Sequence, residues 1–167
     1  MKNAILFACL LCALLFTQSC KYSKEYQTVK AGNDFSLSIP PWLEETDKLK
    51  EGAQLQYSSR YRNVYVIGEV LPSSTPAPQV VAENISRLKK SMLNGLVSDS
   101  VGVTLSGLSG SRVEVYGKMN DENIYFSEVL LQGQGKYYHI SIWTRGEDRK
   151  LRYKADINKI LASFKVL

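Results

Sequence analysis

Two long apolar runs that flank a short glycine-containing turn constrain the fold of this chain more than any other feature. Residues 124–131 and 137–144 are rich in β-branched and aromatic side chains, and the turn between them reads GQGK. In the first run, the apolar residues Phe126 and Val129 lie on opposite faces of the pleat. Strands that are apolar on both faces need cover on both faces. The sequence therefore predicts a long antiparallel hairpin at the centre of a sheet.

Two other stretches have the period of an amphipathic helix and can provide this cover. In residues 79–96, one apolar stripe consists of Val81, Ile85, Leu88, Met92 and Leu96. From about residue 151 to residue 164, a second apolar stripe consists of Tyr153, Ile157, Ile160, Leu161 and Phe164. We expect two helices that pack with these stripes against the sheet.

Shorter segments with strand character complete the predicted sheet. These are residues 34–40, 54–58, 64–70, 101–105 and 112–116. Pro40 and Pro41 end the first of them, and Trp42 is expected to close one end of the core. The predicted fold class is α+β, with an antiparallel β-sheet of about six or seven strands flanked by two amphipathic helices. We expect residues 31–167 to form this single domain.

The first residues of the chain have the pattern of a secretory signal. Lys2 precedes an uninterrupted apolar run over residues 4–16. These 13 residues are fewer than the roughly 20 that a membrane-spanning helix needs. We therefore expect residues 1–19 to be a signal peptide that is removed.

A cysteine directly follows this predicted signal peptide. Ser19 and Cys20 resemble the end of a bacterial lipobox, although Thr17 stands where leucine is typical. We expect a palmitate-bearing lipid anchor on Cys20, followed by a polar tether over residues 20–30. Lys21 follows the cysteine in place of the aspartate that commonly retains lipoproteins at the inner membrane, which favours the outer membrane. The alternative is cleavage by an ordinary signal peptidase, which would leave an unpaired cysteine near the mature terminus.

Cysteine content and charge limit the remaining possibilities. Cys9 and Cys12 lie in the predicted signal peptide, so a hydrophobic core without disulfides must stabilise the mature chain. Its 148 residues (167 minus 19) are sufficient for one such core. The formal net charge of +5 is spread along the sequence without a long basic stripe, which argues against nucleic-acid binding.

His139 is the only histidine and the first candidate for chemistry. On a strand it shares a face with Ser141, but side chains two positions apart are about 6.5 to 7 Å apart. A nucleophile and its base need a hydrogen bond of roughly 2.6 to 3.2 Å. We therefore expect a packed histidine and not a hydrolase dyad. No catalytic residue is predicted, and the protein is not expected to be an enzyme.

No metal or cofactor site is expected either. A single histidine without a free cysteine disfavours a zinc site. Residues 120–123 (NDEN) have the composition of calcium ligands but lack the long alternating ligand loop, so a turn is favoured. The GQGK sequence joins two predicted strands and does not open a helix, so we interpret it as a hairpin turn and not as a phosphate loop.

One surface is a candidate for partner binding. Aromatic and arginine side chains cluster around the turn of the second predicted hairpin: Tyr57, Arg60, Tyr61, Arg62 and Tyr65. These residue types are enriched at binding hot spots. The cluster is expected to be either a docking loop for an envelope protein or an anionic glycan, or a solvated turn flanked by cross-strand tyrosines.

With these elements in place, the chain resembles the PsbP-like superfamily of small α/β/α sandwiches. The resemblance rests on FSLSIPPW at residues 35–42, the helical segment at 85–96, the hairpin at 124–143 and ILASF at 160–164. The superfamily includes a photosystem extrinsic subunit, a Ran-binding nuclear import factor and many bacterial lipoproteins. The resemblance implies a fold but transfers no binding residue, because its members share a scaffold and not a site.

The sequence favours a lipid-anchored protein of the bacterial cell envelope that acts as a non-enzymatic binding or structural module. Its partners would be the membrane, through the lipid anchor, and another envelope component. Two alternatives remain open. One is a carrier of a small apolar ligand in a pocket between sheet and helix, and the other is an enzyme whose site is built from dispersed residues.

Overall fold

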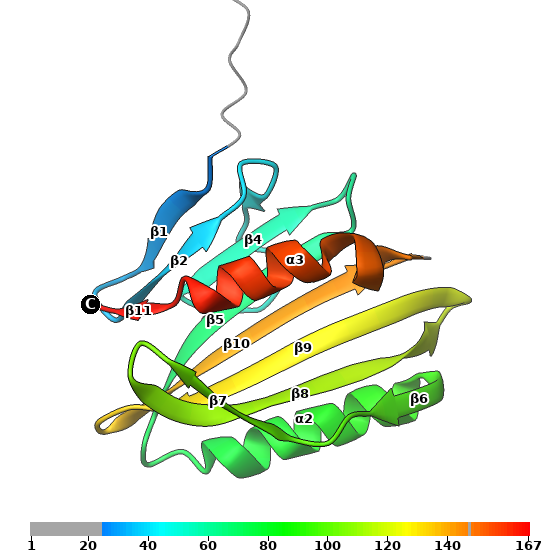
Figure 1. Cartoon of the computed structure of the whole chain (residues 1–167). Helices are drawn as coiled ribbons and strands as arrows, with labels where there is room; N and C mark the ends of the chain where they lie inside the picture. Colours follow the sequence, from blue (N-terminus) through cyan, green and yellow to red (C-terminus); the bar gives the residue numbers. More distant parts are fainter. Residues whose placement is uncertain (1–24, 147) are drawn as a thin grey trace, which may run out of the picture.

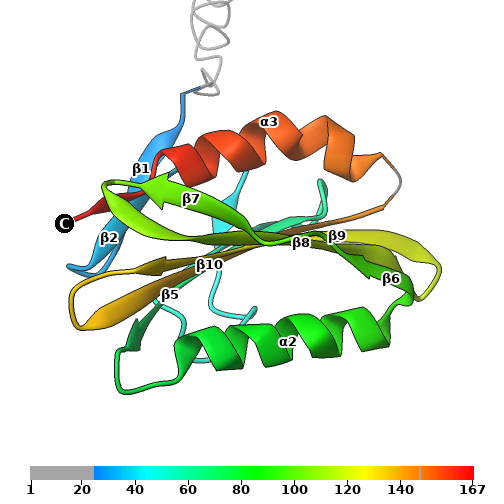
Figure 2. The same ribbon diagram turned by 60° about the horizontal axis from the view of Figure 1, so that its bottom comes forward.

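A computed structural model describes residues 25–146 and 148–167 of the chain, so the predicted signal peptide and Cys20 lie outside the described residues. An eight-stranded antiparallel sheet forms the middle layer of the domain (Figure 1). Helix α2 (Ala77–Ser91) covers one face of this sheet and helix α3 (Arg149–Ala162) covers the other, as Figure 2 shows. The predicted α+β class with two flanking helices is confirmed.

The predicted hairpin lies at the centre of the main sheet. In sheet order, the strands are β3 (Glu44–Glu45), β4 (Leu55–Ser59), β5 (Val64–Pro72), β10 (Lys136–Arg145), β9 (Glu122–Gln132), β8 (Leu108–Met119) and β6 (Leu93–Val97). The eighth strand, β7 (Val101–Leu105), also pairs with β8. The β9–β10 pair is flanked by β5 and β8, so neither of its strands is an edge strand.

A second, three-stranded antiparallel sheet lies on the α3 side of the main sheet. Its strands are β1 (Gln27–Ala31), β2 (Phe35–Ile39) and β11 (Lys165–Val166), in the order β1-β2-β11. Residues 27–30 were expected in the polar tether, but they belong to β1, where Val29 pairs with Leu37. The main sheet has eight strands where about six or seven were expected, and its two-residue strand β3 is too short to show an alternating pattern.

Aromatic rings join the small sheet to the main sheet on the α3 side. The ring of Phe35 lies 5.6 Å from that of Phe164 and 5.8 Å from that of Tyr138, measured between centroids. All three side chains are buried, together with Ile157 and Ile160 of α3. This side holds the larger of the two hydrophobic clusters. The predicted apolar stripe of the last helix is therefore confirmed, although Phe164 follows the helix and does not belong to it.

Helix α2 is shorter than the sequence predicted. It ends at Ser91, and the chain turns back through Asn94, whose φ is 55°, to form β6. A Cβ on Gly95 would lie 2.4 Å from the carbonyl oxygen of Lys89, so only glycine allows this close return over the helix end. Leu96, expected on the helix stripe, is instead 54% exposed on β6.

Because α2 ends at Ser91, it covers only part of the sheet face on which it packs. The helix packs mainly over β6 and β8. Its Met92 end closes a small cluster with Val115 and Ile124. The strands β5, β10 and β9 are therefore only partly covered on this face. No helix among the described residues has both the length and the apolar character to cross a membrane.

Candidate functional site

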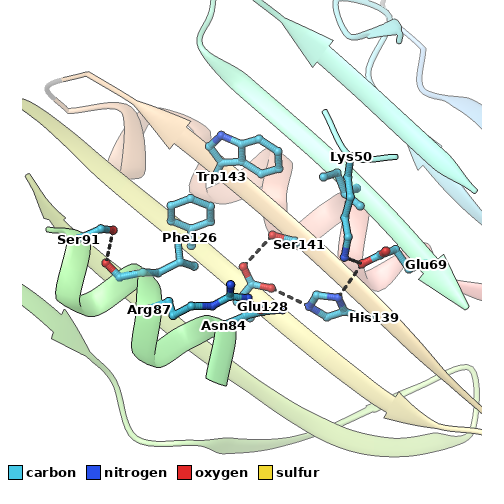
Figure 3. Close-up of a pocket in the computed structure, with 12 residues that line it drawn as sticks. Lys50, Glu69, Asn84, Arg87, Ser91, Phe126, Glu128, His139, Ser141 and Trp143 are labelled. Atoms are coloured by element: carbon cyan, nitrogen blue, oxygen red, sulfur yellow. Dashed lines mark hydrogen bonds and ion pairs between the residues drawn. The ribbon is translucent and has the colours of Figure 1, made fainter. Parts of the chain in front are cut away.

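A pocket of about 500 Å³ lies between α2 and the partly covered strands β5, β9 and β10 (Figure 3). It is lined by Lys50, Ile67, Glu69, Asn84, Arg87, Leu88, Ser91, Phe126, Glu128, His139, Ser141 and Trp143. This volume falls within the range of small-molecule sites in proteins, roughly 300 to 1,000 Å³.

Strand register brings the polar residues of the pocket together. His139 on β10 pairs with Glu69 on β5, and Ser141 on β10 pairs with Glu128 on β9. Because side chains alternate along a strand, all four residues and Trp143 lie on the α2 face. The sequence predicted that His139, Ser141 and Trp143 share a face, and the structure confirms this.

The imidazole of His139 lies between two carboxylates. Its Nδ1 is 3.2 Å from Oε2 of Glu69, and its Nε2 is 2.8 Å from Oε2 of Glu128. Ser141 Oγ donates a hydrogen bond of 2.7 Å to Oε1 of Glu128, and Lys50 Nζ donates one of 2.7 Å to Oε2 of Glu69. Figure 3 shows these contacts as one continuous chain across the pocket floor. His139, Glu69 and Glu128 are each only 6% exposed.

The two carboxylates control the protonation of the histidine. Burial alone would lower the pKa of His139, but the hydrogen bonds to Glu128 and Glu69 and the charges of both raise that pKa to about 9. Burial would raise the pKa of Glu69, but the hydrogen bonds and charges of His139 and Lys50 hold it below its ordinary value. At neutral pH the imidazole is therefore a cation that donates from both nitrogens.

This arrangement does not assemble a nucleophile with its base. Ser141 and His139 both bond to Glu128 and not to each other. An imidazolium with both N–H groups engaged has no lone pair with which to accept a proton. The network can hold and orient a bound polar group, but as it stands it does not activate the serine.

An aromatic row borders the charged floor. Trp143 stacks on Tyr65 with a centroid distance of 5.0 Å and on Phe126 with a centroid distance of 5.6 Å. The three rings come from the neighbouring strands β10, β5 and β9. Two cations stand at the rim, Lys50 with a side chain that is 45% exposed and Arg87 on α2, which is exposed. The pocket therefore combines apolar walls, a charge-balanced floor and a cationic rim.

The predicted docking cluster does not form one surface. Tyr65 stacks on Trp143 on the α2 face, whereas Tyr57 packs against the core on the α3 side. Arg62 also lies on the α3 side, with its guanidinium carbon 5.1 Å from the centroid of the Trp42 ring. Arg60 and Tyr61 are exposed at the turn, and Tyr61 is 91% exposed. Partner binding at these residues stays a prediction.

Sequence reasoning missed Glu69 and Glu128. Glu69 is the one acidic residue of β5 (VYVIGEVLP), and Glu128 is the one acidic residue within the apolar run IYFSEVLL of β9. A carboxylate at such a position is expensive to bury unless it is paired, and that cost is the signal that could have identified both residues.

The NDEN segment forms the turn that its sequence favours. Asn120 and Asp121 connect β8 to β9 with φ values of 50° and 62°, which is the geometry of a two-residue hairpin turn. Within residues 25–146 and 148–167, no group of three or more histidine, cysteine, aspartate or glutamate side chains could hold a metal ion.

Solved structures of three proteins share the fold. The solution structure of cyanobacterial PsbP (CyanoP) from Synechocystis sp. PCC 6803 has a TM-score of 0.61 at 13% identity, covering 90% of this chain and 98% of that one. The Ran-binding protein Mog1p of Saccharomyces cerevisiae has a TM-score of 0.57 at 14% identity, covering 86% and 96%. LpqN of Mycobacterium tuberculosis, described as involved in cell envelope biogenesis, has a TM-score of 0.54 at 15% identity, covering 85% and 90%.

These similarities define a PsbP-like α+β fold, as the sequence resemblance implied. No protein-family model and no curated protein matches the sequence. At these identities the similarity establishes the fold alone, and function must be argued from the site.

Proposed function

We propose that this protein is a lipid-anchored binding module of the bacterial cell envelope that holds a small ligand in the α2 pocket without changing it chemically. The observation that carries the proposal is the pocket itself, in which the buried Glu69–His139–Glu128 chain lies beside the stacked ring of Trp143.

The buried charges support a binding role. Removing paired charges from water costs free energy, and apolar residues of similar volume often stabilise a protein as well or better. A charge chain at the floor of an open pocket therefore has an evident use if it faces a ligand. The ligand should have an apolar or aromatic body that packs against Phe126 and Trp143. It should also carry an acceptor or anionic group within reach of Lys50 and Arg87.

This ligand is more polar than the apolar ligand considered as an alternative from the sequence, because the sequence did not reveal the charged floor. The role is proposed as non-enzymatic because His139 is held as a cation by two carboxylates and does not contact Ser141. Neither residue is then in the state that a hydrolase dyad requires.

The envelope location rests on the first residues of the sequence. The predicted signal peptide and Cys20 favour a lipid anchor, and Lys21 favours the outer membrane. The structural neighbour LpqN is described as involved in cell envelope biogenesis, which agrees with this location. Two or three acyl chains, at about 0.8 kcal/mol for each buried CH₂ group, would hold the domain stably at a bilayer.

The pocket can be tested with its own tryptophan as the reporter. The chain has two tryptophans, so Trp42→Phe leaves only Trp143, which lines the pocket. We expect 1-anilinonaphthalene-8-sulfonate, an aromatic anion, to quench the Trp143 emission of the full chain in a saturable way. Adding Ser91→Phe, which fills the pocket, should weaken this binding by about tenfold or more.

The matched control is Ser86→Phe on the same helix, because Ser86 is exposed and does not line the pocket. Equal binding to the Ser91→Phe and Ser86→Phe proteins would contradict the pocket proposal. The anchor is tested separately by Cys20→Ser. In membrane fractionation, the Cys20→Ser protein should leave the membrane fraction or accumulate as an unprocessed precursor. An N-terminal peptide without acyl chains in the unsubstituted protein would contradict the anchor.

A further inference from the structure

Three arginines gather on the other side of the sheet, away from the α2 pocket. Arg62 in the turn between β4 and β5 and Arg149 and Arg152 in the first turn of α3 line a hollow of about 510 Å³. Tyr61 and Tyr153 complete its lining. The guanidinium groups therefore come from two segments that are far apart in the sequence.

The backbone fixes how these segments meet. The N–H of Arg145, at the end of β10, donates a 3.0 Å hydrogen bond to the carbonyl oxygen of Asn63, at the end of the β4–β5 turn. The chain enters α3 only a few residues later. This hydrogen bond ties the turn that carries Arg62 to the end of β10, the strand that precedes α3.

Aromatic side chains contact two of the arginines. The guanidinium of Arg62 lies over Trp42, whose ring is 5.3 Å from that of the buried Tyr153. Arg149 Nη1 donates a 3.4 Å hydrogen bond to the hydroxyl of the same Tyr153. These contacts orient the guanidinium groups and bring no negative charge to them.

No carboxylate of residues 25–146 and 148–167 lines the hollow. Asp148, which precedes α3, lines a different pocket. Among residues 25–146 and 148–167, none of the ion pairs includes Arg62, Arg149 or Arg152. Like charges repel one another when they share a site, so the arrangement costs free energy unless an anion joins it.

We propose that Arg62, Arg149 and Arg152 form a binding site for a phosphate-bearing anion. The planar guanidinium presents pairs of N–H donors whose spacing matches two phosphate oxygens, so several arginines can share one phosphate group. The hydroxyl of Tyr61, whose side chain is 91% exposed, provides a further donor at the edge.

A phospholipid headgroup is the expected source of the phosphate, and this expectation alone rests on the proposed lipid anchor. Tyr26, near the start of the described chain, lies on α3, because Lys159 Nζ is 3.7 Å from the centroid of its ring. Figure 2 shows the beginning of β1 on the same side of the main sheet as α3. The six residue steps from Cys20 to Tyr26 reach at most about 20 Å, so an anchored domain would keep this side near the bilayer.

The test uses the full chain in a nonionic detergent and two soluble probes. One is inorganic phosphate. The other is glycerophosphoglycerol, a phospholipid headgroup and backbone without the acyl chains. Binding is measured by calorimetric titration at constant ionic strength, because salt screens surface charges. Single Arg→Gln substitutions at the three positions should each weaken binding by about tenfold, and the triple variant should abolish it.

A second triple variant, Arg60→Gln, Lys89→Gln and Lys154→Gln, removes the same charge from exposed positions outside the hollow. The affinity of this control variant for either probe should change by less than about twofold. Tighter binding of glycerophosphoglycerol assigns the site to a lipid headgroup, and tighter binding of inorganic phosphate assigns it to a free phosphate. Failure of both probes to bind, or equal weakening in the two triple variants, would overturn the proposal. An N-terminal peptide without acyl chains in the unsubstituted protein would remove the lipid source but not the phosphate site.

Discussion

Nε2 of His139 lies 2.8 Å from Oε2 of Glu128, although the two residues are not opposite each other in the sheet. The register of the hairpin pairs Glu128 with Ser141 and His139 with Leu130. The carboxylate therefore bonds straight across the hairpin with one oxygen and diagonally with the other. This diagonal contact makes the histidine part of a charge chain that spans three strands.

Stability should depend on pH through His139. Its pKa is raised to about 9 from an ordinary value of 6.5, so its contribution is complete below about pH 6.5 and is lost as the pH rises through about 9. The difference corresponds to on the order of 3 kcal/mol. Denaturant unfolding at pH 6.5, 8 and 9.5 measures it, with His139→Gln as the control.

The unsubstituted protein should lose stability over this range, whereas the His139→Gln protein should lose much less. Parallel losses in both proteins would contradict the assignment. On the acid side the sign reverses for Glu69. Its pKa is lowered, so its contribution is present above the ordinary carboxyl pKa and is lost as the pH falls.

Replacing Glu128 by glutamine should lower the pKa of His139, because it removes a charge and one of the two carboxylate acceptors of the imidazolium. We expect a fall of about one unit or more and a loss of about 2 kcal/mol in the free energy of unfolding. NMR titration can follow the imidazole without assignment, because the chain has one histidine. Glu83→Gln, on the exposed face of α2, should leave the titration unchanged.

Replacing Gly68 by alanine should destabilise the domain by about 1 to 3 kcal/mol. A Cβ at this position of β5 would lie 2.6 Å from Cζ of Phe35, and that ring is fully buried between Tyr138 and Phe164. Thermal unfolding measures the loss. Gly102→Ala is the control, since a Cβ there meets nothing within 4 Å and it should change stability by less than about 0.5 kcal/mol.

Partial recovery in the double variant Phe35→Leu, Gly68→Ala would show that contact with the ring is the cause. If the Gly68→Ala protein were as stable as the Gly102→Ala protein, the close packing of β2 on β5 would be contradicted.

Replacing Asp121 by glycine should stabilise the β8–β9 turn by up to about 1 kcal/mol. Its φ of 62° is left-handed, a conformation that glycine adopts without the steric cost of a side chain. Asp121→Ala should have the opposite sign, because alanine lacks the local hydrogen bonds that help aspartate to adopt this conformation. Urea unfolding of both proteins checks this, and the same sign for both substitutions would contradict the turn geometry.

The sequence predicted the elements better than their ends. The central hairpin and the last helix follow from periodicities of 2 and 3.6 residues, which each segment carries by itself. The predicted helix over residues 79–96 was too long at its C-terminal end. Met92 continues its stripe, but Asn94 and Gly95 allow the chain to fold back, and pairing with β8 makes the last part a strand.

The candidate site was harder to predict. Sequence placed His139, Ser141 and Trp143 on one face, which is correct, but it found neither Glu69 nor Glu128. Which residue of β5 lies beside His139 depends on register, and a shift of one residue would turn Glu69 to the other face. Register also divides the residues of the predicted docking cluster, because Tyr65 lies on the α2 face and Tyr57 on the α3 side.

What the sequence determined by itself is the α+β class, the central hairpin and the two amphipathic segments, because each depends on the alternation of side chains within one stretch of chain. Only the tertiary structure decided that Glu69 and Glu128 enclose His139, and that Arg62 lines one hollow with Arg149 and Arg152. Both arrangements bring together segments that are distant in sequence. Strand register and loop packing set their geometry, and no local period of the sequence encodes either of these.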